Sequence, residues 1–268
     1  MIPPQFDYAA PESVDEAIAL LTQHGDEAKL LAGGHSLIPL MKLRLAAPGV
    51  LIDLGRIGDL SYIKEDGGQV AIGAMTTHND VMGAGLGLIS DVAGKVGDAQ
   101  VRNRGTLGGS LAHGDPASDL PSALLAVEGT LVAQGPSGRR EIPATAFFTD
   151  FLETALNPDE VLVEVRVPKA TSGHNYQKFN KRSHDWAIVG VAAVKAGDGF
   201  RVALTNMGST PLRARGVEEA LAGGASIADA AERAAEGTSP SGDINATPEY
   251  REHLARVLTR RALEAASA

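Results

Sequence analysis

The chain has 268 residues, no cysteine, 24 lysines and arginines against 33 aspartates and glutamates, and 44% hydrophobic residues. This length and composition are those of a globular protein with one large domain or two ordinary ones. The lack of cysteine excludes disulfides, thiolate catalysis and iron–sulfur or zinc–thiolate sites held by this chain alone. A net charge of −9 and only 4% aromatic residues argue against a nucleic-acid partner.

The N-terminal residues resemble no signal peptide, and the longest strongly apolar run, 186–194, is about half the ~20 residues that span a bilayer. We therefore expect a soluble, cytoplasmic protein.

The first part of the chain predicts a strand–helix–strand unit. Ser13 and Glu16 have capping-box spacing before a helix that Gly25 ends. A short strand at 29–32 precedes two glycines and a helix that Ser36 could cap, and residues 50–53 form the next buried strand.

The middle predicts a strand at 70–73, a helix from Thr76 or Thr77 to Met82, a glycine-rich loop over 105–114 and a helix over 118–127. Strands follow at 130–133 and 161–167. In the latter, alternation puts the four valines on one face and Leu162, Glu164 and Arg166 on the other.

A polar stretch at 168–173 could link two domains. Beyond it, strands are expected at 176–181, 187–194 and 200–204, the last two joined by a turn at 197–199, and helices at 212–221, 226–236 and 248–266. Thr247 and Pro248 begin the last helix. The fold class is therefore α+β, with a hairpin-bearing sheet and packed helices at the C-terminal end.

Two loops have the composition of anion-binding cradles, because glycines let the backbone approach a ligand and the N–H groups at a helix start favour negative charge. They are residues 32–36 (AGGHS) and 105–110 (GTLGGS). Either loop alone is more often a tight turn that binds no ligand. Two such loops together favour a diphosphate ligand, which has enough negative oxygens for both. On this interpretation Gly109→Val should obstruct the diphosphate and leave the fold largely intact.

Other nucleotide-binding and catalytic motifs are absent or incomplete in this sequence. The chain has no P-loop signature, residues 83–88 have Leu where a Rossmann fingerprint needs its third Gly, and residues 34–38 have Ile where a nucleophile elbow needs Gly. The seven histidines show no metal-ligand spacing. We predict neither a metal site nor a catalytic side chain in this chain.

Three motifs, AGGHSLIP at 32–39, TLGGS at 106–110 and HGDPASDLP at 113–121, together closely resemble the FAD-binding medium subunits of the molybdenum hydroxylases, in particular the carbon monoxide dehydrogenase branch. The resemblance extends over nearly the whole chain. It implies a two-part FAD-binding domain at 1–170, with subdomains of about 1–57 and 58–170, and a smaller α+β C-terminal domain at 171–268.

The resemblance also implies the FAD-binding residues. Both glycine loops would hold the pyrophosphate through backbone N–H groups, with 32–36 as the first clamp, continued by Leu37 and Ile38, and 106–110 as the second. Asp119 would accept hydrogen bonds from the nucleotide with help from Asp115, and Trp186 would lie against the flavin. The alternative for Trp186 is ordinary packing in the core. Lys178 could contact flavin or phosphate oxygens, although a lysine of this kind is more often exposed to solvent. The full set is Ala32, Gly33, Gly34, His35, Ser36, Leu37, Ile38, Thr106, Leu107, Gly108, Gly109, Ser110, Asp115, Asp119, Leu162, Lys178 and Trp186.

In such a complex a large subunit holds a molybdenum–pterin centre and a small subunit holds two [2Fe–2S] clusters. FAD in this chain would pass their electrons to an acceptor such as a quinone. Carbon monoxide is the preferred substrate, with N-heterocycles or aldehydes as rivals. A dimer of heterotrimers, associated at most with the inner face of the membrane, is expected. The alternatives are a flavin-free scaffold and a freestanding flavin oxidoreductase, although the sequence shows no acid–base constellation for the latter.

Overall fold

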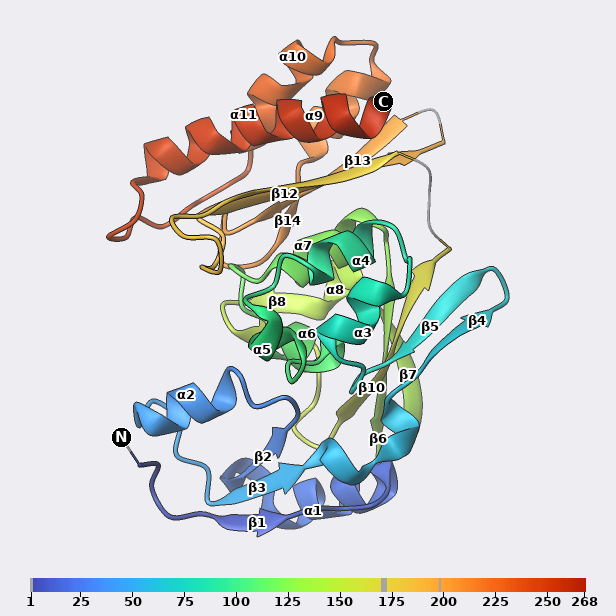
Figure 1. Ribbon diagram of the computed structural model, residues 1–268, viewed down its shortest axis with the longest axis vertical. Helices are drawn as coiled ribbons and strands as arrows, with labels where there is room; N and C mark the ends of the chain where they lie inside the picture. Colours follow the sequence, from blue (N-terminus) through green and yellow to red (C-terminus); the bar gives the residue numbers. More distant parts are fainter. Residues whose placement is uncertain (1, 170–172, 198) are drawn as a thin grey trace.

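The computed structural model describes residues 2–169, 173–197 and 199–268, and its strands form four sheets within those residues (Figure 1). Residues 170–172 of the predicted linker and Asp198 of the predicted turn lie outside the described part. The architecture is α+β, as expected.

The N-terminal unit is a small parallel sheet with the order β1-β3-β2. Its strands are β1 (Asp7–Ala9), β2 (Ala28–Leu31) and β3 (Val50–Asp53), joined by α1 (Val14–His24) and α2 (Leu37–Lys42). Ser13 caps α1 by accepting from the Glu16 amide, while the Glu16 carboxylate accepts from the Glu12 amide. Because β2 and β3 run in parallel, the loop after β2 lies at the carboxyl edge of the sheet, where open α/β sheets bind ligands.

The central part is an antiparallel sheet with the order β4-β5-β10-β6-β7. Its strands are β4 (Ile63–Asp66), β5 (Gln69–Gly73), β6 (Thr130–Gly135), β7 (Gly138–Pro143) and β10 (Val161–Pro168). The helices of this part are α3 (His78–Gly83), α4 (Leu88–Ala93), α5 (Ala99–Arg102), α6 (Leu107–His113), α7 (Asp119–Ala126) and α8 (Ala144–Phe147). A hairpin of β8 (Phe148–Asp150) and β9 (Glu153–Thr154) follows α8.

The prediction of a loop over 105–114 was wrong, because most of this segment is helix α6. Thr106 caps the helix by accepting from the Gly109 amide at 3.1 Å, and Gly114, with φ +66°, ends it. Of the two glycines inside the helix, Gly108 is required because it packs directly on Ala74, where a Cβ would lie 2.5 Å from the Ala74 Cβ.

The predicted alternation in β10 was also wrong. A bulge between Leu162 and Glu164 interrupts the pairing with β6. As a result Val161 and Val163 pack in the core beside α1, while Leu162 joins Val165 and Val167 in the central core.

The C-terminal part is an antiparallel sheet with the order β11-β12-β13-β14. Its strands are β11 (His174–Phe179), β12 (Val189–Ala196), β13 (Gly199–Thr205) and β14 (Leu212–Arg213), so the expected helix at 212–221 begins later than predicted. The helices α9 (Arg215–Ala222), α10 (Ile227–Ala231) and α11 (Pro248–Ser267) cover one face of this sheet, and α4 and α7 lie toward the other (Figure 1). Four 3₁₀ turns complete the described elements: Gly25–Glu27, Leu54–Arg56, Gly58–Leu60 and Glu232–Ala235.

Candidate functional site

A cavity of about 820 Å³ lies where all three parts of the chain converge. Its wall combines the segment after β2, the start of α6, the hairpin β8–β9 and the loop that precedes β12. The volume is within the range of small-molecule sites. Most of the predicted FAD-binding residues line it: Ala32, Gly33, Gly34, His35, Ser36, Leu37, Thr106, Gly108, Gly109, Ser110, Asp119, Leu162, Lys178 and Trp186.

The first glycine loop has the backbone of an anion-binding cradle. Gly34 adopts φ +75°, a conformation that favours glycine. Within the described residues the amides of 33–37 donate to no protein acceptor, and Ser36 begins α2 without a side-chain cap. These N–H groups line a cavity and remain available, which fits the pyrophosphate of FAD.

The two glycine loops touch through their backbones. A Cβ on Gly33 would lie 2.3 Å from the Arg104 carbonyl oxygen and 2.7 Å from the Gly105 Cα. The glycine at 33 is therefore needed for the approach of one loop to the other, in addition to any approach to a ligand.

The second loop contributes less backbone than the sequence suggested. The amides of Leu107, Gly108, Gly109 and Ser110 all donate to protein oxygens, those of Thr76, Ala74 and Thr106. This segment offers small side chains and the Ser110 hydroxyl rather than free amides. A Cβ on Gly109 would lie 2.7 Å from the Thr106 Oγ1, so Gly109→Val would disturb the cap of α6 as well as the cavity.

Asp119 and Lys178 form a buried ion pair at the cavity wall. The Lys178 Nζ lies 2.7 Å from the Asp119 Oδ2, and their side chains are 7% and 6% exposed. The Tyr176 hydroxyl donates to the other carboxylate oxygen at 2.5 Å. Burial raises the pKa of Asp119, and the Lys178 ammonium and the Tyr176 hydroxyl oppose that rise.

Trp186 stands at the rim of the cavity with 54% of its surface exposed, so it is not packed in the core. A half-exposed indole beside a cavity provides an apolar face on which a planar ring can stack.

Three predicted residues lie away from the cavity wall. Ile38 packs below Gly34, and Leu107 is buried in the central core. The Asp115 carboxylate accepts from the Ala117 amide at 2.8 Å and thereby shapes the turn that leads into α7. Asp115 therefore shapes the loop, and its assistance at the nucleotide stays a prediction.

The sequence interpretation missed Tyr176 and His78. Tyr176 is two residues from Lys178 on β11, and this spacing, which places both side chains on one face of a strand, could have indicated it. His78 is 3% exposed, lies against Gly105, and its Nδ1 has no hydrogen-bond partner among the described residues. Burial, together with the charges of His35 and Arg102, lowers the pKa of His78 to about 4.

The interpretation also missed the hairpin segment from Leu152 to Asn157. Arg140 fixes this segment, because its guanidinium pairs with Glu160 at 2.6 Å and donates to the Ala155 carbonyl at 2.6 Å. No local motif indicated this pairing, which depends on the fold.

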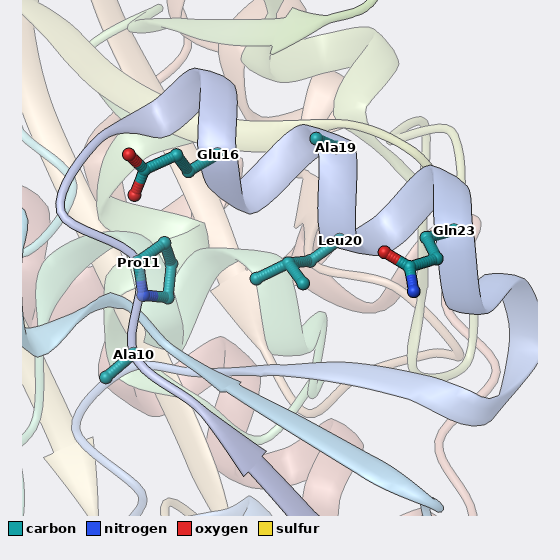
Figure 2. A pocket seen from close by; sticks show the side chains of 6 residues that line it. All are labelled: Ala10, Pro11, Glu16, Ala19, Leu20 and Gln23. Atoms are coloured by element: carbon teal, nitrogen blue, oxygen red, sulfur yellow. The ribbon is translucent and has the colours of Figure 1, made fainter.

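A second, shallow hollow lies on the outer side of α1, between that helix and the segment before it (Figure 2). It is lined by Ala10, Pro11, Glu16, Ala19, Leu20 and Gln23, none of which belongs to the predicted site.

The fold and the cavity are those of a nucleotide-cofactor-binding protein, with two glycine segments that line one cavity. The family model described as the FAD binding domain in molybdopterin dehydrogenase matches residues 4–170, and the CO dehydrogenase flavoprotein C-terminal domain matches residues 174–266. The chain belongs to this family: it is an FAD-binding medium subunit of the molybdenum hydroxylase type and thus part of an oxidoreductase.

Among its relatives, the carbon monoxide dehydrogenase medium chain of Hydrogenophaga pseudoflava is 45% identical, over 99% of this chain and 98% of the relative. The nicotine 6-hydroxylase medium subunit of Paenarthrobacter nicotinovorans is 36% identical, over 99% and 98%. The solved carbon monoxide dehydrogenase from Hydrogenophaga pseudoflava superimposes with a TM-score of 0.95 over 100% of this chain and 99% of that chain, at 45% identity. Of the helices that the structure describes, none has the length and apolar content needed to cross a membrane.

Proposed function

We propose that this chain holds FAD in the 820 Å³ cavity and carries electrons within a carbon monoxide dehydrogenase-type complex. The observation that carries the proposal is the convergence of the first glycine loop, the Asp119–Lys178 pair and Trp186 on one cavity. Bound there, FAD would supply a redox centre that takes up electrons and releases them.

Different residues of the cavity wall would bind different parts of FAD. The free amides of residues 33–37 would donate to pyrophosphate oxygens, and Ser36 and Ser110 would add hydroxyl donors. Asp119, held by Lys178 and Tyr176, would accept from hydroxyl or N–H groups of the cofactor. Trp186 would cover one face of the flavin.

The proposed boundary at 170/171 divides the chain into the FAD-binding domain, with subdomains 1–57 and 58–170, and the C-terminal domain 171–268. The ranges of the two family models support this division. The C-terminal domain would supply Lys178 and Trp186 to a cofactor held mainly by the first domain.

The partners are proposed from the family resemblance. A small subunit with two [2Fe–2S] clusters would deliver electrons, and a large subunit with a molybdenum–pterin centre would oxidise the substrate. Carbon monoxide is the proposed substrate because the carbon monoxide dehydrogenase medium chain is 45% identical to this chain. An N-heterocycle is the second candidate, because the nicotine 6-hydroxylase medium subunit is 36% identical.

The acceptor is proposed to be a quinone, which a cytoplasmic dimer of heterotrimers would meet at the inner face of the membrane. The family resemblance alone supports this part.

Purification of the native complex through a tag on this chain tests the proposal. Two copurifying chains, with molybdenum, iron and one FAD per copy, are expected. Oxidation of carbon monoxide, nicotine or an aldehyde by the purified complex with a quinone acceptor then identifies the substrate class. A lone yellow protein without metals would favour a freestanding flavoenzyme, and a colourless protein with partners would favour a scaffold.

A further inference from the structure

The segment that carries Trp186 is held in place by side chains from elsewhere in the fold, which donate hydrogen bonds to its backbone carbonyls. Trp186 lies between β11 and β12, and the next two residues, Ala187 and Ile188, are buried. The Ala187 carbonyl accepts from the Asn206 side-chain amide at 2.8 Å, and the Ile188 carbonyl accepts from the Arg251 guanidinium. The exposed indole is therefore attached to a backbone whose direction two distant side chains set.

Asn206 also contacts the segment that leads to Asp119. Its backbone amide donates to the Pro116 carbonyl at 2.8 Å, three residues before Asp119 begins α7. The preceding residue, Thr205, adds a contact to the same helix, since its hydroxyl lies 2.5 Å from that of Ser122. One residue thus joins the Trp186 segment to the start of α7.

The backbone of Asn206 has the left-handed conformation, with φ +63°. Few residues other than glycine adopt this conformation readily, and asparagine is one of them. This conformation lets the amide and the side chain of Asn206 bond to two different segments. A glycine could supply the conformation but not the side-chain donor to Ala187.

We propose that Asn206 is a positioning residue that orients Trp186 over the cavity, which on the proposed function means over the flavin. It acts on Trp186 through the Ala187 carbonyl and does not itself line the cavity. Arg251 supports the same segment, but it also pairs with Asp243 at 2.8 Å and is almost completely buried, so its replacement would disturb the C-terminal core.

The test uses the full chain with Asn206→Gly and Asn206→Asp. Asn206→Gly keeps the left-handed conformation and the bond to Pro116 and removes only the donor to Ala187. Asn206→Asp keeps the shape but sets a carboxylate against that carbonyl. Asn175→Asp is the matched control, because the Asn175 side chain bonds to Gln177 and not to the Trp186 segment.

Trp186 is the only tryptophan, so indole fluorescence reports on this segment alone. Loss of one ordinary hydrogen bond should raise the population of the released segment about fivefold. We expect both Asn206 variants to change the emission maximum and to increase quenching by acrylamide in the FAD-free chain. With FAD bound, they should weaken the quenching of Trp186 by the flavin while FAD content stays near that of the wild type. The control should match the wild type.

A purely structural role would lower the melting temperature and leave Trp186 emission and both kinds of quenching unchanged, and that result would overturn the proposal. The fluorescence of the FAD-free chain tests the positioning independently of the cofactor. If FAD does not quench Trp186 in the wild-type chain, the placement of Trp186 over the flavin fails, whereas the role of Asn206 still stands or falls on the FAD-free data.

Discussion

Lys178 and Asp119 have almost no contact with solvent, so each charge is compensated by the other rather than by water. Removing one member of such a pair leaves an uncompensated buried charge, which costs about 3–5 kcal/mol. Lys178→Met should therefore lower the free energy of unfolding of the FAD-free chain by about that amount. Denaturant titration measures the change. Lys169→Met is the matched control, because its partner Glu65 is 72% exposed and exposed pairs contribute about 0–1 kcal/mol.

The stability of Lys178→Met should depend on pH through the raised pKa of Asp119, which the lysine no longer opposes. With Lys178 removed, burial raises the pKa of Asp119 further, so the folded state binds a proton that the unfolded state lacks. The destabilisation should shrink as the pH falls toward 4, and Asp119→Asn in the same background should recover part of the loss. Equal destabilisation at all pH values would contradict this account of the pair.

His78 gives the folded chain a dependence on pH of its own. Its pKa in the folded protein is about 4, below the value of 6.5 for a free histidine, because the imidazole is buried. Between these values the unfolded state binds more protons, so stability falls as the pH drops below 6.5. From pH 7 to pH 5 the loss from this residue alone should be about 2 kcal/mol. Denaturant unfolding of the wild type and His78→Gln at both pH values isolates it, and equal pH sensitivity in the two would refute the assignment.

The contact of the two glycine loops makes Gly33 sensitive to the smallest side chain. A methyl group there would overlap the Arg104 carbonyl, so Gly33→Ala should separate the loops and misplace the free amides of residues 33–37. We expect FAD affinity to fall by about tenfold or more, equivalent to about 1.4 kcal/mol. Gly58→Ala is the control, because a Cβ on Gly58 meets no atom within 4 Å. Flavin fluorescence titration of the FAD-free chain measures both, and unchanged affinity in Gly33→Ala would place the pyrophosphate elsewhere.

The elements that follow from local rules were predictable from the sequence. The cap at Ser13, the strand at 50–53 and the start of the last helix at Thr247 depend on residues within a few positions of one another, and the structure confirms them. Helix α6 was missed because its glycines reduce local helix propensity, and contacts with Ala74 and the cap from Thr106 compensate. The bulge in β10 depends on pairing with β6, a partner almost thirty residues away that alternation cannot show.

The candidate site was predictable to the extent that it consists of loops with characteristic sequence motifs. The glycine segments, Asp119, Lys178 and Trp186 were named from motifs and resemblance, and the structure brings them to one cavity. Tyr176, His78 and the hairpin 152–157 were not named, because their places depend on how separate elements pack. Asp115 was also named from a local motif, and its role at the nucleotide stays a prediction, since the structure shows one of its carboxylate oxygens bonded to Ala117 within the turn.

At the scale of the whole molecule, the two segments matched by the family models share a hydrophobic core. Tyr176, Ala192 and Ala203 of the C-terminal sheet are in the same buried cluster as Leu120 and Ala123 of α7. The hydrogen bond between Ser122 and Thr205 crosses the same contact. Apolar surface shared in this way couples the stability of the two parts, unlike the polar contact between independent domains.

The full FAD-free chain should therefore unfold in a single transition, although its sequence divides into two matched segments. Trp186 emission follows the C-terminal part, and far-UV circular dichroism follows the whole chain, so the two denaturation curves should coincide. Ala203→Asp, which buries a charge in the shared core, should shift both curves together and cost several kcal/mol. Ala225→Asp, at an exposed position, should shift neither. An early Trp186 transition that leaves the remaining dichroism intact would show that the parts unfold independently, and the shared core would then be too weak to hold Trp186 and Lys178 against the cavity.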